Sequence, residues 1–331
     1  MSDTACPILP ADDPDAVTRA VEALRAGRLV GVPTETVYGL AGDATDAASV
    51  GSIFAAKGRP AVNPLIVHVE ELARAERLGR FDGAARALAD AFWPGPLTVV
   101  VPQREGHGLA NAVTAGLGTV ALRQPRGVMA RLVTRLGRPL AAPSANRSGR
   151  LTAVTADRVA DDLGERLALV LDAGPCAIGL ESSVVAVSSD GVRLLREGGV
   201  PREAIEAVVG SLGIDTRPDG TAAPASPGQL LRHYAPSLPL RLDATDVREG
   251  EAALRFAARP GGRAVASCDL SPSGDLDEAA HNLFAHLAAL EASGARAIAV
   301  APVPSHGIGA AINDRLARAA AASRADAGDD G

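Results

Sequence analysis

The sequence has few aromatic residues, few cysteines and no long apolar run. Only 2% of its 331 residues are aromatic while 47% are hydrophobic, so a folded core has to be built mainly from Ala, Val and Leu. The three cysteines, Cys6, Cys176 and Cys268, lie far apart and form no C-x-x-C pair. This spacing predicts neither a disulfide framework nor a cysteine zinc site, and it is typical of a reducing compartment. We expect no metal site made by the protein alone.

The sequence also lacks signals for export or membrane insertion, and it lacks an excess of positive charge. No stretch has the length of a membrane span, and residues 1–13 carry acidic residues where a secretory signal needs a basic start and an apolar run. We therefore expect a cytoplasmic protein with no membrane partner. The formal net charge of -6 argues against a chain that grips nucleic acid through bulk positive charge, so any basic site has to be local.

The length of the chain favours two domains. Apolar residues at helical spacing alternate with short apolar runs, which predicts an α/β fold with a mixed, twisted sheet. A first helix follows Asp13, and a second lies between the N-cap Asp46 and Gly58. Further helices are expected near 83–92, 127–136, 155–163 and 201–209, and strands at 29–33, 65–69, 97–101, 119–123, 167–171, 183–187 and 192–196.

A linker and a second domain follow. Residues 211–238 are rich in Pro, Gly, Asp, Thr and Ser and show no hydrophobic period, which indicates a linker. We expect a first domain over 12–210 and a smaller α/β domain over 239–324. In the latter, strands are predicted at 238–242, 263–267 and 297–300, and helices at 246–258, 276–292 and 310–323.

Several common motifs are absent. There is no G-x-x-x-x-G-K-S/T phosphate loop, no H-E-x-x-H and no G-x-S-x-G elbow. Residues 116–121 fit G-x-G-x-x-A, but they run into a strand and open no helix, which is the wrong context for a dinucleotide site. Any nucleotide would therefore have to bind at a different kind of phosphate-binding site.

Polar motifs follow several of the predicted strands. PTETVYGL at 33–40 places Thr34, Thr36 and Tyr38 directly after a buried strand, where α/β proteins keep their ligands. Taken alone, this segment would be an ordinary Thr-rich turn with its tyrosine in the core. Lys57 and Arg59 follow a helix, and a loop braced by two prolines comes next. Two fixed cations suit a polyphosphate, although basic residues at a helix C-terminus also complement the macrodipole by about 0.3–1 kcal/mol.

Four later segments follow the same arrangement. One ends on Arg123, and another runs into the segment PSANRSG, whose Ser144 and Asn146 can donate to phosphate or carboxylate oxygens. A capped turn before the next helix would also explain that segment. The segments GLESS around Ser182 and LREG around Arg196 repeat the arrangement. This repetition favours one polar cleft at the strand ends.

Together, PTETVYGL, KGRP with NPL, ALRQP, PSANRSG, GLESSVV and LREG resemble the YrdC-like family of threonylcarbamoyl-AMP synthases in order and spacing. The segments 226–236 and 307–320 resemble the linker and the end of the accessory domain of its long form, so the resemblance covers nearly the whole chain. It implies a YrdC-like catalytic domain with an open basic cleft, an ordered linker that acts as a lid, and a Rossmann-like accessory domain.

The resemblance also implies a reaction. The family is expected to condense L-threonine, bicarbonate or CO2, and ATP with Mg²⁺, giving threonylcarbamoyl-AMP and pyrophosphate in a nucleotidyl transfer. The product is the donor for threonylcarbamoyl-adenosine next to the anticodon of tRNA. A downstream tRNA threonylcarbamoyl-transferase complex is the implied partner, and a weak contact with tRNA is a further expected interaction.

Site residues carry over by resemblance. Those implied to bind threonine are Thr34, Thr36, Tyr38, His68, Arg123, Pro143, Ser182 and Ser183. Those implied to bind the nucleotide are Lys57, Arg59, Asn63, Thr119, Ser144, Asn146, Thr152, Arg196, His233 and Tyr234, of which Lys57, Arg59 and Arg196 would neutralise charge in catalysis and His233 and Tyr234 would close the lid. Leu230 and Leu231 stand where many long-form linkers have a basic and an aromatic residue, which affects the lid contacts.

Two alternatives remain at this point. The arginines could form a concave RNA-binding surface of a translation or ribosome-maturation module, although scarce aromatics leave little for base stacking. The same fold could also form carbamoyl-AMP in a carbamoyltransferase.

Overall fold

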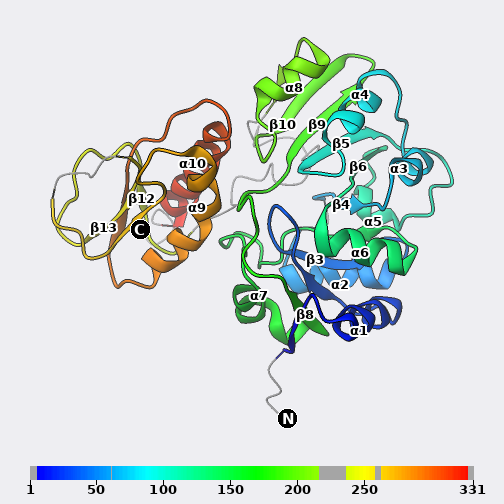
Figure 1. Ribbon diagram of the computed structural model, residues 1–331, viewed down its shortest axis with the longest axis horizontal. Helices are drawn as coiled ribbons and strands as arrows, with labels where there is room; N and C mark the ends of the chain where they lie inside the picture. Colours follow the sequence, from blue (N-terminus) through cyan, green and yellow to red (C-terminus); the bar gives the residue numbers. More distant parts are fainter. Residues whose placement is uncertain (1–5, 61, 216–235, 258–261, 327–331) are drawn as a thin grey trace.

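The computed structural model describes residues 6–60, 62–215, 236–257 and 262–326. Most of the predicted linker, with Leu230, Leu231, His233 and Tyr234, lies outside these residues. Figure 1 shows two bodies side by side, a large one built around an eleven-stranded sheet and a small one built around a four-stranded sheet.

The large sheet is mixed. Its strands are β1 (Ile8–Pro10), β2 (Val30–Val32), β3 (Gly39–Asp43), β4 (Ile66–His68), β5 (Leu97–Pro102), β6 (Thr119–Arg123), β7 (Leu140–Ala141), β8 (Leu169–Asp172), β9 (Ser183–Ser188), β10 (Gly191–Arg196) and β11 (Gly213–Ile214). Their order is β1-β8-β2-β3-β7-β4-β6-β5-β9-β10-β11. Pairs such as β4 with β6 are parallel, whereas β2 with β3 and β5 with β6 are antiparallel. The predicted mixed α/β architecture is confirmed.

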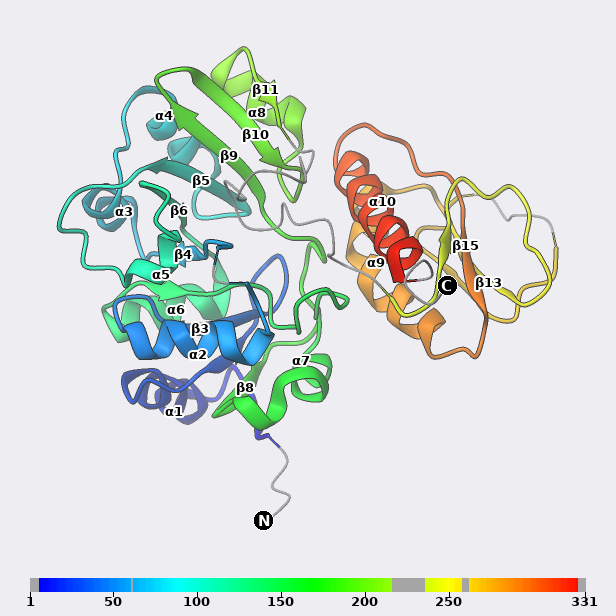
Figure 2. The same ribbon diagram turned by 180° about the vertical axis from the view of Figure 1, so that it is seen from behind.

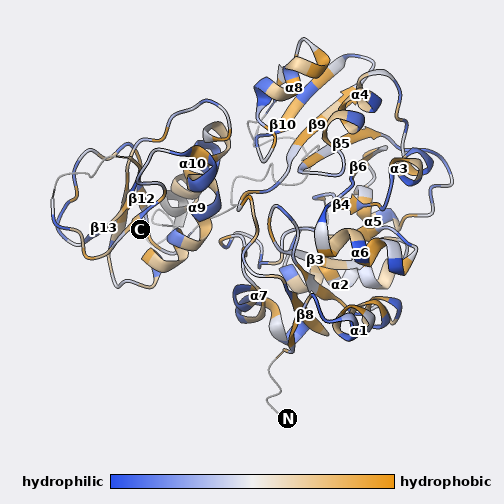
Figure 3. Cartoon of the chain, viewed as in Figure 1, coloured by the Kyte–Doolittle hydropathy of each residue, from blue (hydrophilic) through white to orange (hydrophobic). Residues whose placement is uncertain are grey.

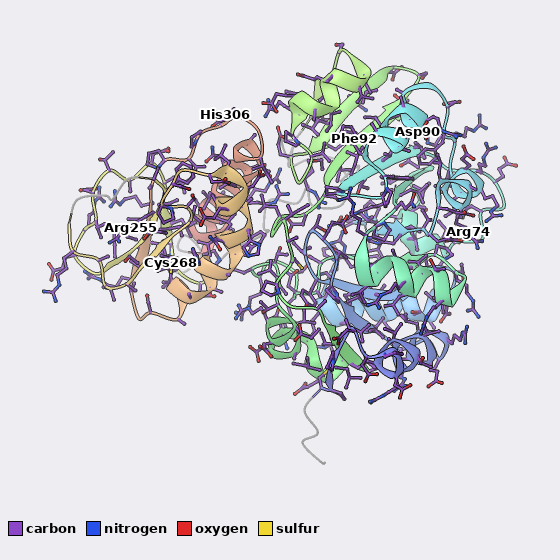
Figure 4. The ribbon with its side chains drawn as sticks, viewed as in Figure 1. Arg74, Asp90, Phe92, Arg255, Cys268 and His306 are labelled. Atoms are coloured by element: carbon purple, nitrogen blue, oxygen red, sulfur yellow. The ribbon has the colours of Figure 1, made fainter. Side chains whose placement is uncertain are left out.

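Helices cover both faces of this sheet. They are α1 (Pro14–Arg25), α2 (Ala47–Lys57), α3 (Leu72–Leu78), α4 (Gly83–Phe92), α5 (Asn111–Thr114), α6 (Gly127–Leu136), α7 (Ala156–Leu163), the short 3-10 helix η1 (Gly164–Arg166) and α8 (Arg202–Val209). Residues of α1 and α6 form one apolar cluster with β2, β3, β7 and β8, and residues of the other α-helices form the cluster on the opposite face. Figure 3 shows the apolar strands between helices of alternating hydropathy.

Local sequence signals explain the helices that approach the site. The side chain of Asp46 accepts hydrogen bonds from the backbone N–H groups of Ala48 and Ser49 and so starts α2. Gly58 ends the helix at φ 60°, in the left-handed region that favours glycine. The chain therefore turns sharply after Lys57 and carries Arg59 toward the sheet.

The small domain contains a parallel sheet in the order β12-β15-β13-β14. Its elements are β12 (Leu240–Arg241), β13 (Glu251–Arg255), β14 (Ser267–Asp269), α9 (Leu276–Glu291), β15 (Ala297–Val300) and α10 (Gly309–Asp326). The two views in Figures 1 and 2 show α9 and α10 on the side of the small sheet that faces the large domain.

Two sequence predictions in this domain are wrong. The predicted helix over 246–258 is replaced by β13, which lies between β14 and β15. Residues 251–254 are all buried, so continuous burial in a parallel sheet overrides the helical preference of the Ala and Leu residues. The strand expected at 263–267 lies at Ser267–Asp269, where it pairs with β13.

The two domains share an apolar interface. Val37, Leu151, Val154 and Leu180 of the large domain belong to the same buried cluster as the apolar residues of α9 and α10. At Gly179, a Cβ atom would lie 2.6 Å from the backbone oxygen of a residue in α9, and φ is 78°. The backbones therefore meet at a point where only glycine fits.

Candidate functional site

One pocket gathers the polar motifs at the strand ends. It contains about 520 Å³ of space between atoms, part of which is open to solvent. The lining residues come from the β2–β3 loop, α2–β4 loop, β4, β6, the segment after β7, and the ends of β9 and β10: Thr34, Thr36, Val37, Tyr38, Gly39, Arg59, Ile66, His68, Arg123, Ala142, Pro143, Ser144, Glu181, Ser182 and Arg196. His68 and Arg123 are register partners at the carboxyl ends of parallel strands β4 and β6.

The threonine-rich turn forms one wall. The Thr34 hydroxyl accepts from the N–H groups of Thr36 (3.1 Å) and Val37 (3.2 Å), which fixes the turn. Arg123 donates from Nη1 to the Thr36 hydroxyl (3.0 Å) and from Nε to the Gly95 carbonyl (3.1 Å). Both threonines and the arginine are buried. The turn and the arginine therefore hold one another in place.

An ion pair lies behind this wall. Glu35 Oε1 lies 2.7 Å from Arg123 Nη2, and the exposed fractions of the two side chains are 11% and 4%. Burial alone would raise the pKa of Glu35, but the charge and hydrogen bond of Arg123 hold that pKa below its ordinary value. Burial, followed by the positive charge of Arg123, lowers the pKa of His68 to about 3. The pocket therefore presents a neutral imidazole at physiological pH.

Lys57 and Arg59 take different positions. Lys57 is buried, and its ammonium donates to the carbonyls of Ser144 and Asn146. Burial and the neighbouring charge of Arg59 lower its pKa well below the ordinary value. Arg59 lines the pocket and donates to the carbonyls of Asn63 (3.2 Å) and Pro64 (2.9 Å). Lys57 thus fastens the segment after β7, while Arg59 faces the pocket.

The opposite wall is built around Ser182. Its hydroxyl lies 2.8 Å from that of Thr98, and Arg196 donates to its carbonyl through Nε (3.0 Å) and Nη2 (2.9 Å). Arg196 also lies 3.1 Å from the Ser182 hydroxyl. The adjacent Glu181 accepts from the Thr152 hydroxyl at 2.7 Å. These contacts connect the GLESS and LREG motifs directly.

Some buried polar atoms within the described residues have no hydrogen-bond partner there. They include both amide atoms of Asn63, the Oδ1 atom of Asn146 and the Nδ1 atom of His68. Such groups are costly when left unpaired, and they are common where a ligand supplies the missing partner. Across the described ranges, no group of three or more His, Cys, Asp or Glu residues could hold a metal ion. No described helix is long and apolar enough to cross a membrane.

The structure brings most of the implied residues together. Ten of them line the pocket: Thr34, Thr36, Tyr38, Arg59, His68, Arg123, Pro143, Ser144, Ser182 and Arg196. Lys57, Asn146 and Thr152 bond to the pocket wall without lining it. The Ser183 hydroxyl donates to Val200 O (2.6 Å), away from the lining. Thr119 lies at the opposite end of β6 from Arg123, and its role in nucleotide binding stays a prediction.

Sequence reasoning did not identify three residues. Glu35 lies within the PTETVYGL segment, but nothing in its sequence context indicates a partner 88 positions away. Glu181 precedes Ser182 and lines the pocket as well. Arg315 contacts Glu181 from α10 at 2.9 Å, across 134 positions of chain. Its sequence context, NDRLAR at 313–318, also contains an aspartate and a second arginine and gives no signal for this contact.

Two sequence families match the chain. The Sua5/YciO/YrdC family, described as "Telomere recombination", matches residues 22–198. The family described as "Threonylcarbamoyl-AMP synthase, C-terminal domain" matches residues 200–321. The first match covers β2 to β10 of the large sheet, and the second covers α8, β11 and all four strands of the small sheet.

Curated relatives carry one name. A threonylcarbamoyl-AMP synthase of Bacillus subtilis is 44% identical over 237 residues, which cover 71% of this chain and 68% of the relative. The alignment with one of Pyrococcus abyssi is 37% identical over 312 residues and covers 89% of this chain and 91% of the relative. The alignment with one of Schizosaccharomyces pombe is 32% identical over 371 residues, gaps included, and covers 96% of this chain and 91% of the relative.

A solved structure agrees over the full length. The crystal structure of Pyrococcus abyssi Sua5 complexed with L-threonine superposes with a TM-score of 0.87 at 34% identity, covering 97% of this chain and 98% of that one. The E. coli YciO structure, 19% identical with a TM-score of 0.51, shares the fold of the large domain. The chain therefore belongs to the Sua5/YciO/YrdC family, in the long form that also carries the threonylcarbamoyl-AMP synthase C-terminal domain.

Proposed function

We propose that this chain condenses L-threonine, bicarbonate or CO2, and ATP into threonylcarbamoyl-AMP and pyrophosphate. The observation that carries the proposal is a single pocket in which hydroxyls and a neutral imidazole share the walls with three buried arginines, Arg59, Arg123 and Arg196. Relatives at 32–44% identity carry the corresponding name, and a structural neighbour is a complex with L-threonine.

The wall around Arg123 suits a small hydroxylated amino acid. Thr34, Thr36 and Ser182 offer hydroxyls, and His68 offers one donor and one acceptor because it is neutral. Arg123 is the cation of this wall and matches a carboxylate. An apolar contact for the threonine methyl group would separate threonine from serine by only about 1–3 kcal/mol.

The cations of the other walls suit the nucleotide. Arg59 lies after α2 and Arg196 at the end of β10, so two guanidinium groups face the pocket from different elements. Guanidinium groups bind phosphate oxygens bidentately and stabilise charge as it moves onto pyrophosphate. Lys57 acts indirectly, because its ammonium donates to the carbonyls of Ser144 and Asn146 and so holds that segment in place.

The chemistry needs no covalent enzyme intermediate. The threonine amine adds to CO2, forming an N–C bond and releasing a proton, and a carbamate oxygen then attacks the α-phosphorus while the bond to pyrophosphate breaks. Positioning and charge neutralisation are sufficient for this sequence. The described residues provide no metal-ligand cluster, so Mg²⁺ would enter with ATP, held mainly by the phosphates and water.

The product has to be passed on. A mixed anhydride of a carbamate and AMP is reactive, and the proposed consumer is a tRNA threonylcarbamoyl-transferase complex that modifies adenosine next to the anticodon. The three arginines of the pocket, Arg59, Arg123 and Arg196, are buried and do not form an exposed surface. This supports the role of an enzyme over that of an RNA-binding module.

Pyrophosphate release tests the proposal. Purified protein with ATP and Mg²⁺ should release pyrophosphate only when both L-threonine and bicarbonate are present. Arg196→Met should lower kcat/KM by about 10²–10³-fold, since it removes a charged donor to the reacting phosphates. Arg193→Met on the same strand is the matched control, because Arg193 is exposed and contacts only Asp215, at 3.8 Å, among its ion pairs in the described chain. Release that ignores threonine, or equal effects of both substitutions, would contradict the proposal.

A further inference from the structure

An arginine of the small domain reaches the wall of the pocket. Arg315 of α10 has an exposed fraction of only 1%. Its Nε atom donates to Glu181 Oε2 at 2.9 Å, and its Nη2 atom donates to the Glu197 carbonyl at 2.8 Å. Glu181 precedes β9 and Glu197 follows β10, so one side chain joins the residue before Ser182 to the residue after Arg196.

The segments around Glu181 and Glu197 are packed tightly against each other. The N–H of Gly199 donates to the Glu181 carbonyl at 3.0 Å, and a Cβ atom at Gly198 would lie 2.4 Å from that same oxygen. The second carboxylate oxygen of Glu181 accepts from Thr152 at 2.7 Å. A shift of Glu181 would therefore move Ser182 and release the hydroxyl of Thr152.

The charge of Glu181 depends on its neighbours. Burial disfavours the carboxylate, but Arg315 of α10 and Arg196 of β10, with the hydrogen bonds of Arg315 and Thr152, hold its pKa below the ordinary value. Lys57 of α2 is the other cation that interacts with it. Of the two arginines, Arg315 lowers the pKa of Glu181 more than Arg196 does, and Arg315 belongs to the small domain.

Domain attachment alone does not explain this arginine. The apolar cluster that joins the large domain to α9 and α10 already provides a docking surface. A buried ion pair adds little to stability compared with apolar residues of similar volume. A contact aimed at a pocket-lining carboxylate therefore indicates a role in the pocket.

We propose that Arg315 is a positioning residue for the active site, through which α10 of the small domain holds Glu181, and with it Ser182 and Thr152, in the arrangement that binds substrates. The inference rests on the proposed function for its kinetic readout. It gives the small domain a part in building the pocket.

Two interdomain arginines make a matched comparison. Arg315→Met should lower kcat/KM for pyrophosphate release at least about tenfold, since small misplacements of site residues have effects of this size. Arg158→Met removes another ion pair between the domains, with Glu291 at 3.7 Å, and Arg158 does not line the pocket. That variant should stay within twofold of the unmodified protein. Equal kcat/KM values for both variants would overturn the proposal.

A double-variant cycle separates positioning from general destabilisation. In a Glu181→Gln background the carboxylate that Arg315 holds is absent, so adding Arg315→Met should change kcat/KM less than about twofold. In the Arg315→Met variant alone, Glu181 becomes easier to protonate, so activity should recover as pH rises. The Glu181→Gln background should show no such recovery. Equal losses in both backgrounds would contradict the role assigned to Arg315.

Two safeguards keep the test decisive. If Arg315→Met does not fold, Arg315→Lys takes its place, because lysine keeps the charge but cannot form both hydrogen bonds, and the same cycle applies. If the unmodified protein shows no threonine-dependent release, the proposed function fails, and L-threonine affinity by calorimetry becomes the readout. Weaker binding in Arg315→Met than in Arg158→Met would still support the positioning role, and equal binding would overturn it.

Discussion

His68 provides a stability prediction whose size follows from its position in the pocket. Its imidazole is buried at the end of β4 beside Arg123, and these two causes lower its pKa to about 3. In the unfolded chain the pKa of histidine is about 6.5. Below pH 6.5 the unfolded state therefore binds a proton that the folded state does not bind.

The sign and magnitude follow from proton linkage. Since the unfolded state binds more protons, the free energy of unfolding falls as pH falls, and the loss continues until the folded pKa is reached. Between pH 7 and pH 5 this single group removes about 2 kcal/mol of the free energy of unfolding, at about 1.4 kcal/mol for each pKa unit. The carboxylates with lowered pKa values, Glu35 and Glu181, lose their contribution only at more acidic pH.

Urea unfolding at pH 7 and pH 5 measures this effect. Trp93 is the only tryptophan of the chain, and its ring lies 5.4 Å from that of Phe81, so its fluorescence reports on the large domain. His68→Gln removes the titrating group, and its free energy of unfolding should fall about 2 kcal/mol less than that of the unmodified protein. Other groups, including His286, are present in both proteins and cancel in the difference. An identical pH dependence in both proteins would refute a neutral, buried His68.

Two further predictions concern the frame of the pocket. Lys57→Ala leaves the carbonyls of Ser144 and Asn146 without their ammonium donor, so we expect a loss of about 1.5–3 kcal/mol in the free energy of unfolding and a higher KM for ATP. Urea unfolding and initial rates would show this, and an unchanged KM would contradict it. Gly179→Ala places a Cβ atom 2.6 Å from a carbonyl of α9 and should cost about 1–3 kcal/mol of domain packing, detected as faster proteolytic separation of the domains. Proteolysis at an unchanged rate would count against the close approach.

The sequence predicts most of the large domain because its signals are local. Asp46 and Gly58 mark the ends of α2, and short apolar runs mark the strands, so their positions follow from capping and periodicity. The prediction for the segment EAALR in the small domain is wrong because its residues favour a helix in isolation. Only the neighbouring strands β14 and β15 make it a buried strand.

The candidate site divides in the same way. The motifs around Thr34, Arg123 and Ser182 predict its residues because each lies at one end of a strand: after β2, at the end of β6 and directly before β9. Their mutual arrangement does not follow from sequence, since it depends on which strand ends become neighbours. The pairing of Glu35 with Arg123 and of Arg315 with Glu181 joins segments 88 and 134 positions apart, and no local pattern encodes such contacts.

The most direct test of the central claim follows the carbon atom of bicarbonate. Purified protein is incubated with isotopically labelled bicarbonate, ATP, Mg²⁺ and L-threonine, and the adenylate products are separated and identified by mass. We expect one labelled product that contains threonine, one carbon from bicarbonate and AMP, formed in equal amount to pyrophosphate and absent without L-threonine. A labelled adenylate formed equally well without L-threonine, or pyrophosphate release with no label in the adenylate, would contradict it.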